Sequence, residues 1–343
     1  KPDRRQRQMC IRDSIMRDVD YGWVIRYMHT TGASLFFAVV YLHMFRGLLY
    51  GSYQKPKELV WIFGCTIYLA MMAEGFLGYV LPYGQMSYWG AQVIISLFGA
   101  IPYVGESLEL WVRGDYYISG ITVSRFFALH VVALPLILIA LVFLHLVALH
   151  EVGAGNPEGV DIEEHLDEDG VPLDSVPFYP YKVLNGLVAI GVFMTVFAII
   201  MFFFPEGGGY IIEMANFQEA NPLVTPDHIA PVWYYAPFYT MLRAIPDPLG
   251  GLIVMAAAVA IFFIVPWLDR SKVASIRYKG IYSKIAITLF GVSFLTLGYL
   301  GTVGVTEIRK IMSIICTIIY FAYFLLMPIY TKYEKTKEVP TRL

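Results

Sequence analysis

Long apolar stretches, separated by polar segments, dominate the pattern of hydrophobic and polar positions along this chain. A helix needs about 20 predominantly apolar residues to cross the hydrocarbon core of a bilayer. Seven stretches meet that requirement, and we therefore predict an all-α integral membrane protein with seven transmembrane helices. The predicted helices cover residues 22–50, 59–81, 125–149, 183–204, 249–268, 283–303 and 311–330.

Three connections between these helices are long: residues 82–124, 150–182 and 205–248. The second is acidic, which is typical of a solvated surface. The other two contain Trp, Tyr, Pro and aliphatic residues, as in AIPYVG and HIAPVWYYAPFY. Such sequences suit partly buried backbone, and we expect these two connections to line a cavity at the membrane surface.

Composition agrees with a membrane protein, because 57% of the 343 residues are hydrophobic and only 15% are charged. The net charge of −2 gives no reason to expect a nucleic-acid partner. Cys10, Cys65 and Cys316 lack motif spacing and predict neither a disulfide framework nor a cysteine metal site. Residues 1–14 are polar, Arg-rich and without periodicity, so we expect a head that is either disordered or foreign to the rest.

Two histidine pairs inside apolar stretches carry the strongest chemical signal. His29 and His43 are 14 residues apart, and His130 and His145 are 15 apart. On a helix, 14 residues return to within about 40° of the starting direction and rise about 21 Å. Each helix therefore presents two imidazoles on one face at two depths of the bilayer. Two such helices side by side predict two bis-imidazole haem sites stacked across the membrane.

A single histidine in a transmembrane helix usually makes a hydrogen bond to a neighbouring helix, and that alternative applies to each of the four separately. Lysine and arginine counts orient the chain, because cytoplasmic loops carry the excess of both. His43 and His145 then lie toward the cytoplasm. The first and third helices run parallel, so we pair His29 with His130 and His43 with His145. The cytoplasmic cations are Arg46, Lys55, Lys57, Lys182, Arg270, Lys272, Arg277, Lys279, Lys284, Lys332, Lys335, Lys337 and Arg342, against Arg113, Arg243, Arg309 and Lys310 outside.

Arginines flank the histidines at short spacing. Arg26 precedes His29 by three residues, Arg46 follows His43 by three, and Arg125 precedes His130 by five. A guanidinium is a natural partner for a haem propionate, although ordinary snorkelling at helix ends is the alternative. Small residues could let a flat macrocycle approach a helix backbone, or could serve close helix packing. They are Gly32, Gly47, Gly64 and Gly78.

At this point the chain from about Ile15 onward resembles the cytochrome b family, the di-haem core subunit of ubiquinol–cytochrome c oxidoreductase (complex III), in its bacterial type. The matching stretches are GWVIRYMHTTGASLFF with YLHMFRGLLYGSY, GYVLPYGQMSYWGAQVI with AIPYVG, RFFALH with LHLVALHEVGAGNPEG, and ANPLVTPDHIAPVWYYAPFYTMLRAIPDPLGG. The resemblance implies two non-covalent b-type haems on the four histidines. It also implies eight transmembrane helices, and we expect the first to be missing before residue 15.

The resemblance divides the chain into the head 1–14, a di-haem bundle over 15–204, and a segment 205–343 with the quinol-site loop and three helices. The third helix has a spacing of 15 between its histidines where the mitochondrial form has 14. We expect a kink or bulge near Pro135 to absorb the extra residue.

Two quinone sites follow from the resemblance. The inner, quinone-reducing site is expected near His43 and His145, with His150 as a hydrogen-bonding group. The outer, quinol-oxidising site is expected between AIPYVG and PVWY, with Tyr234 as a catalytic residue. Its other expected residues are Gln85, Met86, Tyr103, Pro231 and Trp233.

The outer site departs from the family pattern, because Val232 occupies the place of a glutamate that is thought to take a proton from quinol. Another acid must then serve. We expect Glu74, the only carboxylate well inside an apolar span and about 12 Å from Pro82, to do so. The alternative for Glu74 is a structural acid. Fallback candidates in the outer loop are Glu206, Glu213 and Glu219.

The inner site departs as well. Asn185 and Gly186 stand where the family has a Lys-Asp pair, and Ala154 stands at the place of a family serine. Lys182 is a possible substitute there.

The resemblance implies that quinol at the outer site gives one electron to an iron–sulfur partner and one to the haems, which carry it to quinone at the cytoplasmic side while protons are translocated. The chain has no C-x-x-C-H motif and no iron–sulfur cysteine set, so other subunits must supply the high-potential branch. The expected partners are a Rieske iron–sulfur subunit, a c-type cytochrome subunit and a second copy of the complex. The expected substrate is ubiquinol, and the expected location is the bacterial cytoplasmic membrane.

Three other readings remain. A transporter with a His/Glu proton relay predicts internal repeats and broken helices, and no such repeat is visible. The membrane anchor of another dehydrogenase, also a di-haem protein, lacks a PVWY-type loop. A di-metal membrane enzyme needs more clustered histidines than the seven present.

Overall fold

The computed structural model describes residues 4–343, with side chains from residue 10 onward, and is built from helices with no strand among these residues. Within residues 4–343, seven helical spans are long and apolar enough to cross a membrane, which confirms the predicted class. The spans are α2 (Gly22–Tyr50), α3 (Glu58–Val80), α6 (Gly120–Ala128) continuing into α7 (Leu134–Val152), α8 (Val183–Phe203), α10 (Pro248–Leu268), α11 (Ile281–Thr302) and α12 (Glu307–Leu325).

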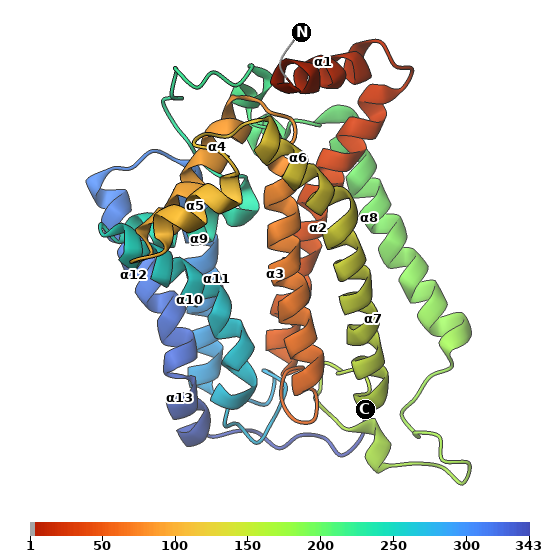
Figure 1. Cartoon of the computed structure of the whole chain (residues 1–343). Coiled ribbons are helices and arrows are strands. Elements are labelled where there is room, and N and C mark those ends of the chain that lie inside the picture. The colour runs from red at the N-terminus through yellow and green to blue at the C-terminus, as the bar shows by residue number, and fades with distance from the viewer. Residues whose placement is uncertain (1–3) are drawn as a thin grey trace.

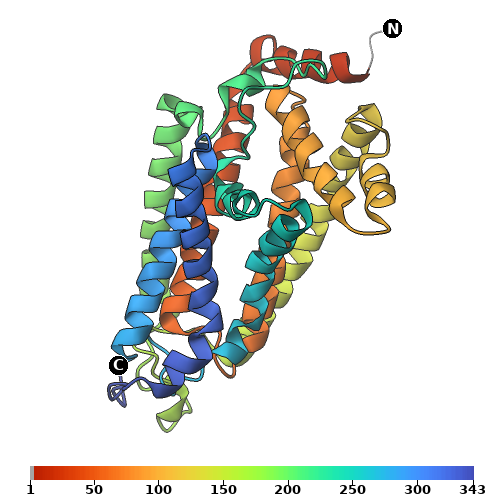
Figure 2. The same ribbon diagram turned by 90° about the vertical axis from the view of Figure 1, so that its left-hand side faces the viewer.

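The shorter helices lie at the two ends of the molecule and in its long outer loops. Figure 1 shows α1 and α4 toward one end of the molecule, whereas α13 and the C-terminus lie toward the opposite end. Figure 2 shows the same elongated shape, with the two termini at opposite ends. The bounds are α1 (Arg4–Arg17), α4 (Gln85–Ser96), α5 (Gly105–Arg113), α9 (Ala236–Ala244) and α13 (Met327–Tyr333).

The spans form two groups that share one core. Helix α7 packs on α3 and α2 on α8, while α11 packs against α9 and α12. The main cluster of buried residues contains Phe37 and Tyr68 from the first group and Phe238 and Tyr320 from the second. The indole of Trp61 on α3 donates a hydrogen bond of 2.7 Å to the backbone oxygen of Phe262 on α10. Each group is therefore anchored to the other by aromatic packing.

Local signals explain where several helices begin and end. Asp247 precedes Pro248 and accepts a hydrogen bond of 2.6 Å from the backbone nitrogen of Gly250, which caps α10. Gly51 ends α2 at a φ of 65°, and a Cβ there would lie 2.5 Å from the backbone oxygen of Ala274. Only glycine suits that position, because both the conformation and the space exclude a side chain.

The third span contains a π-helical turn over Leu129–Ala133, directly before Pro135. A π turn holds one more residue than an α turn, so it absorbs an insertion without changing the direction of the residues that follow. The predicted bulge is confirmed. His130 and His145, although 15 residues apart, consequently have the rise and direction of residues 14 apart in a regular α-helix. This spacing matches that of the histidines on α2.

The head differs from our expectation. Residues Arg4–Arg17 form α1, and the guanidinium of Arg12 donates a hydrogen bond of 3.2 Å to the backbone oxygen of Asn216. Of the two alternatives for the head, disorder is therefore wrong for residues 4–14, whereas a foreign origin stays a prediction. Residues 1–3 lie outside the described part. The polar composition of α1 shows no apolar period that would predict a helix there.

Candidate functional site

The four histidines meet in two pairs between α2 and the span that contains α7. The rings of His29 and His130 have centroids 6.1 Å apart and planes inclined at 70°. The rings of His43 and His145 have centroids 6.4 Å apart and planes inclined at 73°. Two imidazoles that each place a nitrogen about 2 Å from one metal ion have centroids about 6 Å apart. Both pairs thus have the separation that a bis-imidazole haem site requires.

Two glycines of α3 make room for the histidines of the facing helix. A Cβ on Gly78 would lie 2.9 Å from Nδ1 of His130 and 3.0 Å from Nε2. A Cβ on Gly64 would lie 3.4 Å from Cε1 of His145. Because Gly64 and Gly78 are themselves 14 residues apart, α3 repeats the spacing of the histidines. Both glycines bring an imidazole edge against the α3 backbone.

The two glycines of α2 have different surroundings. A Cβ on Gly32 would have only the ring of Phe197 within 4 Å, at 3.8 Å, so open space lies beside the α2 backbone there. A Cβ on Gly47 would lie 3.0 Å from the ring of Trp61. Gly32 therefore suits the approach of a flat group, whereas Gly47 serves helix packing.

Glu74 lies beside His130 and not in an outer cavity. Nδ1 of His130 is 3.0 Å from the backbone oxygen of Glu74 and also 3.0 Å from its Oε1. A proton on Nδ1 satisfies both oxygens and leaves Nε2 free to bind a metal. Glu74 therefore does not line the outer cavity, where the sequence analysis expects the proton acceptor for quinol. Its place is fixed by the helix register of α3, which points it at α7.

An outer cavity of about 330 Å³ lies between α4 and the long loop 205–248. Met86, Pro231 and Trp233 line it, as the sequence analysis expects. Glu213 and His228 also line it. The sequence analysis names Glu213 only as a fallback candidate and assigns no role to His228. Their positions depend on the course of the loop, for which the sequence offers no periodic signal. The other lining residues are Gly208, Gly209, Tyr210, Met214, Ala215, Ala230 and Thr302.

Glu213 is a half-buried carboxyl group that accepts a hydrogen bond from the hydroxyl of Tyr79 on α3. Burial raises the pKa of Glu213 to about 7, and the hydrogen bond from Tyr79 opposes that rise. The group therefore changes charge near neutral pH at the wall of the outer cavity.

Three residues expected at the outer site do not line this cavity. Gln85 is 6% exposed and holds the loop, because its amide nitrogen donates to the oxygen of Val224 at 2.6 Å and its oxygen accepts from the nitrogen of Asn221 at 2.7 Å. Tyr103 is fully exposed. Tyr234 is buried, and its ring stacks on Phe37 with centroids 3.9 Å apart. Its side chain belongs to the main cluster of buried residues.

The three arginines differ in their contacts. Arg26 is half-buried on α2, one helical turn from His29. Arg46 is exposed and its guanidinium lies 5.8 Å from the centroid of the Tyr50 ring. Arg125 donates a hydrogen bond of 2.8 Å to the backbone oxygen of Trp111. Arg26 and Arg46 are placed beside the histidine pairs, whereas Arg125 is engaged with α5.

At the opposite end, His150 is exposed near the end of α7, and Lys182 is exposed just before α8. Both lie on the side of the His43–His145 pair. The inner quinone site remains a prediction.

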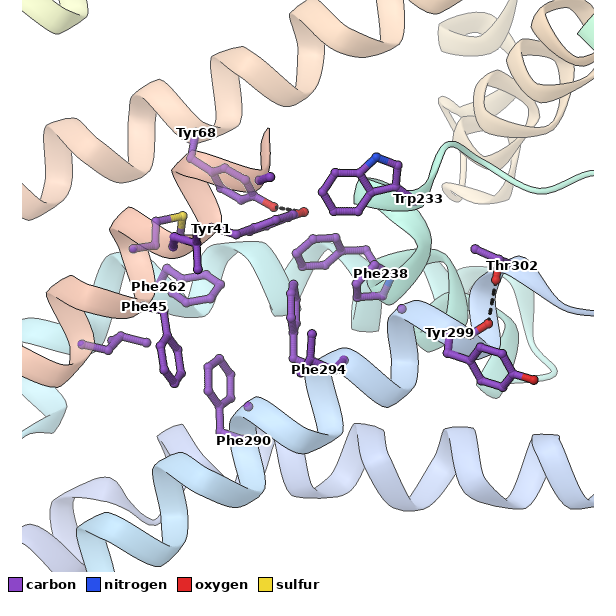
Figure 3. Close-up of a pocket in the computed structure, with 18 of the residues that line it drawn as sticks. Tyr41, Phe45, Tyr68, Trp233, Phe238, Phe262, Phe290, Phe294, Tyr299 and Thr302 are labelled. Atoms are coloured by element: carbon purple, nitrogen blue, oxygen red, sulfur yellow. Dashed lines mark hydrogen bonds between the residues drawn. The ribbon is translucent and has the colours of Figure 1, made fainter. Parts of the chain in front are cut away.

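A larger cavity of about 830 Å³ lies between α2, α3, α9, α10 and α11, and no sequence pattern indicated it (Figure 3). Tyr41 and Tyr68 meet inside it with their hydroxyl oxygens 3.1 Å apart. Because five helices contribute to the wall, only their packing creates the cavity. The lining residues include Ala38, Leu42, Phe45, Phe238, Phe262, Phe290, Phe294, Leu295, Gly298 and Tyr299.

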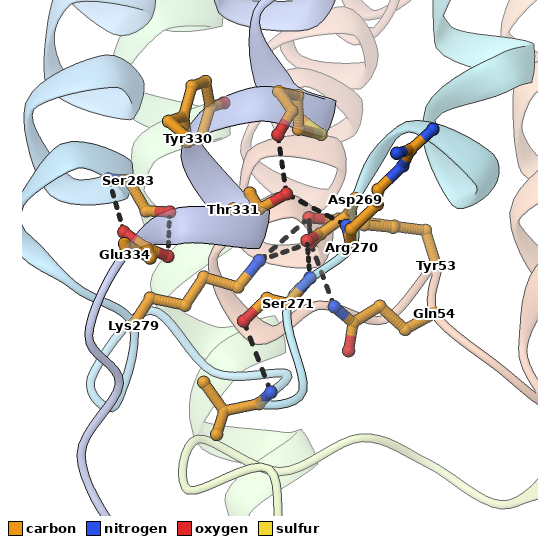
Figure 4. A network of polar contacts seen from close by, with 12 residues as sticks. Tyr53, Gln54, Asp269, Arg270, Ser271, Lys279, Ser283, Tyr330, Thr331 and Glu334 are labelled. Atoms are coloured by element: carbon orange, nitrogen blue, oxygen red, sulfur yellow. Dashed lines mark hydrogen bonds and ion pairs between the residues drawn. The ribbon is translucent and has the colours of Figure 1, made fainter.

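A buried polar network ties the two groups of helices together at the inner end (Figure 4). Lys279 forms an ion pair with Asp269, whose side chain is 0% exposed, while that of Lys279 is 5% exposed. Asp269 also accepts hydrogen bonds from the hydroxyl of Tyr53 at 2.7 Å and from the amide of Gln54 at 3.0 Å. Residues from the α2–α3 connection and the α10–α11 connection therefore share one carboxylate.

Comparisons with known proteins agree with this arrangement. A family model described as cytochrome b/b6/petB matches residues 6–153, and one described as cytochrome b(C-terminal)/b6/petD matches residues 219–321. A protein of Allochromatium vinosum named cytochrome b is 56% identical over 337 residues, which cover 96% of this chain and 81% of the relative. A cytochrome b of Rickettsia bellii is 48% identical over 332 residues, which cover 96% of this chain and 80% of the relative.

Among solved structures, one titled hyperthermophilic respiratory complex III matches with a TM-score of 0.86 at 36% sequence identity. The match covers 94% of this chain and 82% of that chain.

Proposed function

The chain belongs to the cytochrome b family, with a respiratory electron-transfer role, and on this premise we propose that it oxidises quinol at its outer cavity and reduces quinone near its inner end. We propose two non-covalent b-type haems, one held by His29 and His130 and the other by His43 and His145. The observation that carries this proposal is the centroid separation of 6.1 Å and 6.4 Å in the two imidazole pairs. A haem bound between two imidazoles supplies a centre that accepts and returns single electrons.

The surroundings of both pairs fit the flat macrocycle. Gly64 and Gly78 remove side chains from the α3 backbone beside the rings, and Gly32 leaves space on α2. The half-buried Arg26 and the exposed Arg46 lie one turn from a histidine each, where a propionate would need a cation. Arg125 has a backbone partner already and is the weakest of the three for this role.

The two depths of the histidine pairs suit the transfer of electrons across a membrane. Fourteen residues on α2 separate the two levels by about 21 Å within an apolar layer of about 30 Å. The two pairs would therefore hold one haem each at two depths between the outer cavity and the cytoplasmic end, where the haems would supply one-electron centres across the insulating layer.

Quinol gives up two electrons and two protons on oxidation, so the outer site needs a proton acceptor. Val232 cannot serve, and Glu74 is committed to His130. We assign the acceptor role to Glu213, which lines the outer cavity and has a pKa raised to about 7 by burial. A base with a pKa near the working pH takes up a proton readily and also releases it. His228, exposed on the same cavity, offers the next group for that proton.

We assign Glu74 the role of a positioning residue for His130. A carboxylate that accepts the Nδ1 proton fixes the tautomer and the orientation of a ligand imidazole and increases its basicity. The second carboxylate oxygen, Oε2, is buried without a hydrogen-bond partner, so Oε1 carries this interaction.

We further propose that the protein works as the core subunit of a quinol–cytochrome c oxidoreductase in the bacterial cytoplasmic membrane, with a Rieske iron–sulfur subunit, a c-type cytochrome subunit and a second copy of the complex. The solved structure that it resembles is titled as a respiratory complex III. The sequence itself lacks cysteine sets for an iron–sulfur cluster or for covalent haem.

A haem count on the membrane-expressed chain tests the assignment. Reduced-minus-oxidised spectra with a haemochrome assay should give two b haems per chain. His29→Ala and His43→Ala should each remove one haem, whereas His165→Ala in the 150–182 loop should keep both. Two haems that survive in both helix variants would show that other residues bind them.

A further inference from the structure

Lys57, at the inner end of α3, is a half-buried cation to which the proposed function gives no role. It is the N-cap of α3, and its backbone oxygen accepts a hydrogen bond of 3.1 Å from the backbone nitrogen of Trp61. Lys57 therefore continues the register of that helix. Burial lowers the pKa of its ammonium, and the carboxylates of Asp161 and Glu163 oppose that shift.

The ammonium of Lys57 has no close counter-charge. None of the ion pairs formed among residues 10–343 includes it, so the carboxylates of Asp161 and Glu163 lie more than 4.0 Å from its Nζ. A half-buried cation without a partner is unfavourable in the folded protein. An anion bound beside Lys57 would remove that penalty.

Lys57 lies on the same face of α3 as the two glycines that contact the histidines. It precedes Gly64 by seven residues, which is half the spacing between Gly64 and Gly78. Seven residues turn a helix by about 700°, within about 20° of two full turns, and rise about 10.5 Å. A Cβ on Gly64 would lie 3.4 Å from Cε1 of His145. Lys57 is therefore about 10 Å to the inner side of the His145 ring along α3.

The surroundings of Nζ place it next to the end of α7. A Cβ on Gly155 would lie 3.8 Å from Nζ of Lys57. Gly155 follows Val152, the last residue of α7, by three positions. Helix α7 carries His145 and packs on α3 (Figure 1). The ammonium consequently lies between the inner end of α3 and the chain that leaves α7, on the inner side of the His43–His145 pair.

We propose that Lys57 binds a propionate carboxylate of the haem held by His43 and His145. The inference rests on the proposed function, because it needs the inner haem. A haem carries two propionates, and Arg46 is the only lysine or arginine within four residues of either histidine in the sequence. Charged carboxylates are most stable toward the nearer membrane surface, which for this pair is the inner one. A quinone head fits less well, because its neutral carbonyl oxygens leave the ammonium without a counter-charge.

Three variants separate this role from a general effect of surface charge. Lys57→Met removes the charge and keeps the length of the side chain, whereas Lys57→Arg keeps the charge. Lys55→Met is the matched control, because Lys55 is an exposed cation in the same connection between α2 and α3. The outer haem serves as an internal reference in every variant.

The experiment is a potentiometric titration of both haems in the assembled membrane complex. A positive charge stabilises the reduced haem, so Lys57→Met should lower the ratio of reduced to oxidised inner haem about tenfold at a fixed ambient potential, or about 59 mV for one electron. Lys57→Arg and Lys55→Met should stay close to the wild type. The resonance Raman band of propionate bending should move for the inner haem in Lys57→Met alone. If Lys57→Met loses the inner haem, Lys57→Arg should retain it.

Other results overturn the inference in distinct ways. An unchanged inner potential with a raised KM for quinone reduction would assign Lys57 to the quinone. Equal losses of thermal stability in Lys57→Met and Asp161→Asn, without a redox effect, would show that Lys57 only holds the 150–182 loop. An equal shift in Lys55→Met would reduce the effect to surface charge. A wild-type complex without a haem at His43 and His145 would refute the proposed function itself, whereas the first three results leave that function intact.

Discussion

At the scale of single residues, two carboxyl groups near the outer end lie in different surroundings, and we propose a different role for each. Glu213 faces a cavity and Tyr79, and burial moves its pKa to about 7. Glu74 faces the imidazole of His130 and leaves one oxygen buried without a partner. We therefore propose that Glu213 takes up protons at the cavity, whereas Glu74 orients a ligand imidazole.

Glu213→Gln should lower the rate of quinol oxidation at pH 8 by about a hundredfold, because a positioned base contributes at least that much. In the wild type the rate should rise with pH through about 7, as Glu213 loses its proton, and this rise should be absent in the variant. Steady-state assays of the complex from pH 5.5 to 9 would measure both effects. A variant with an unchanged pH profile would show that another group takes the proton.

Stability gives an independent check of Glu213. Burial raises its pKa in the folded protein to about 7, above the ordinary range of a glutamate, so the charged form is disfavoured there. The contribution of Glu213 to the free energy of unfolding therefore falls as pH rises from the ordinary glutamate range through about 7. Glu213→Gln should raise the thermal midpoint at pH 8 and change it little at pH 4.5.

Glu74→Gln should raise the reduction potential of the outer haem, because an amide increases the basicity of His130 less than a carboxylate does. We expect a shift on the order of 60 mV, a tenfold change for one electron. Potentiometric titration of the haem spectra measures it, with the inner haem as an internal reference. Glu307→Gln, at an exposed position on α12, is the control. An outer potential that stays within error of the wild type would reject the positioning role.

At the scale of secondary structure elements, the site depends on three helices with a common spacing. On α2 the two histidines are 14 residues apart in a regular helix, and on α3 the two glycines are also 14 residues apart. In the third span the histidines are 15 residues apart, and a π turn absorbs the extra residue. The turn over Leu129–Ala133 contains His130 itself, so the irregularity lies at the functional residue. Register between helices, more than any single contact, makes two pairs possible.

Gly78→Val tests that register on α3. Its side chain would collide with the ring of His130, and we expect loss of the outer haem with the inner haem retained. Haem counts and redox spectra measure this outcome. Gly191→Val on α8 is the control, since nothing lies within 4 Å of a Cβ at that position. Retention of both haems in Gly78→Val would show that the ring has more freedom than the geometry implies.

At the scale of the whole molecule, a shared aromatic core and the polar network at the inner end join the two groups of helices. The network of Asp269 and Lys279 is buried and receives Tyr53 and Gln54 from the other group. The cavity of about 830 Å³ lies between the same two groups. Their relative position therefore determines the size of that cavity.

Asp269→Asn should destabilise the protein by about 3–5 kcal/mol, because it leaves the ammonium of Lys279 buried without a counter-charge. The double variant Asp269→Asn/Lys279→Met should recover most of that loss. Thermal unfolding in detergent, followed by haem absorbance, measures both. A single variant as stable as the wild type would mean that water reaches Lys279 in the folded protein.

Most of the fold was predictable from the sequence, because crossing a bilayer requires helices whose length and apolar composition are visible residue by residue. The expected spans 22–50 and 59–81 differ from α2 and α3 by one residue at most. The bulge before Pro135 followed from the mismatch between 14 and 15. Helix α1 was missed because a polar helix that lies on distant backbone shows no apolar period.

The sequence by itself determined the two imidazole levels, since helix geometry converts residue spacing directly into depth and direction. It could not place side chains on loops or across helix boundaries. Only the tertiary structure shows that Glu74 contacts His130 and that Glu213 and His228 line the outer cavity. It also shows that Gln85 and Tyr103 do not line that cavity. Those positions depend on how separate helices and a long loop pack, and packing is a property of residues that are far apart in the chain.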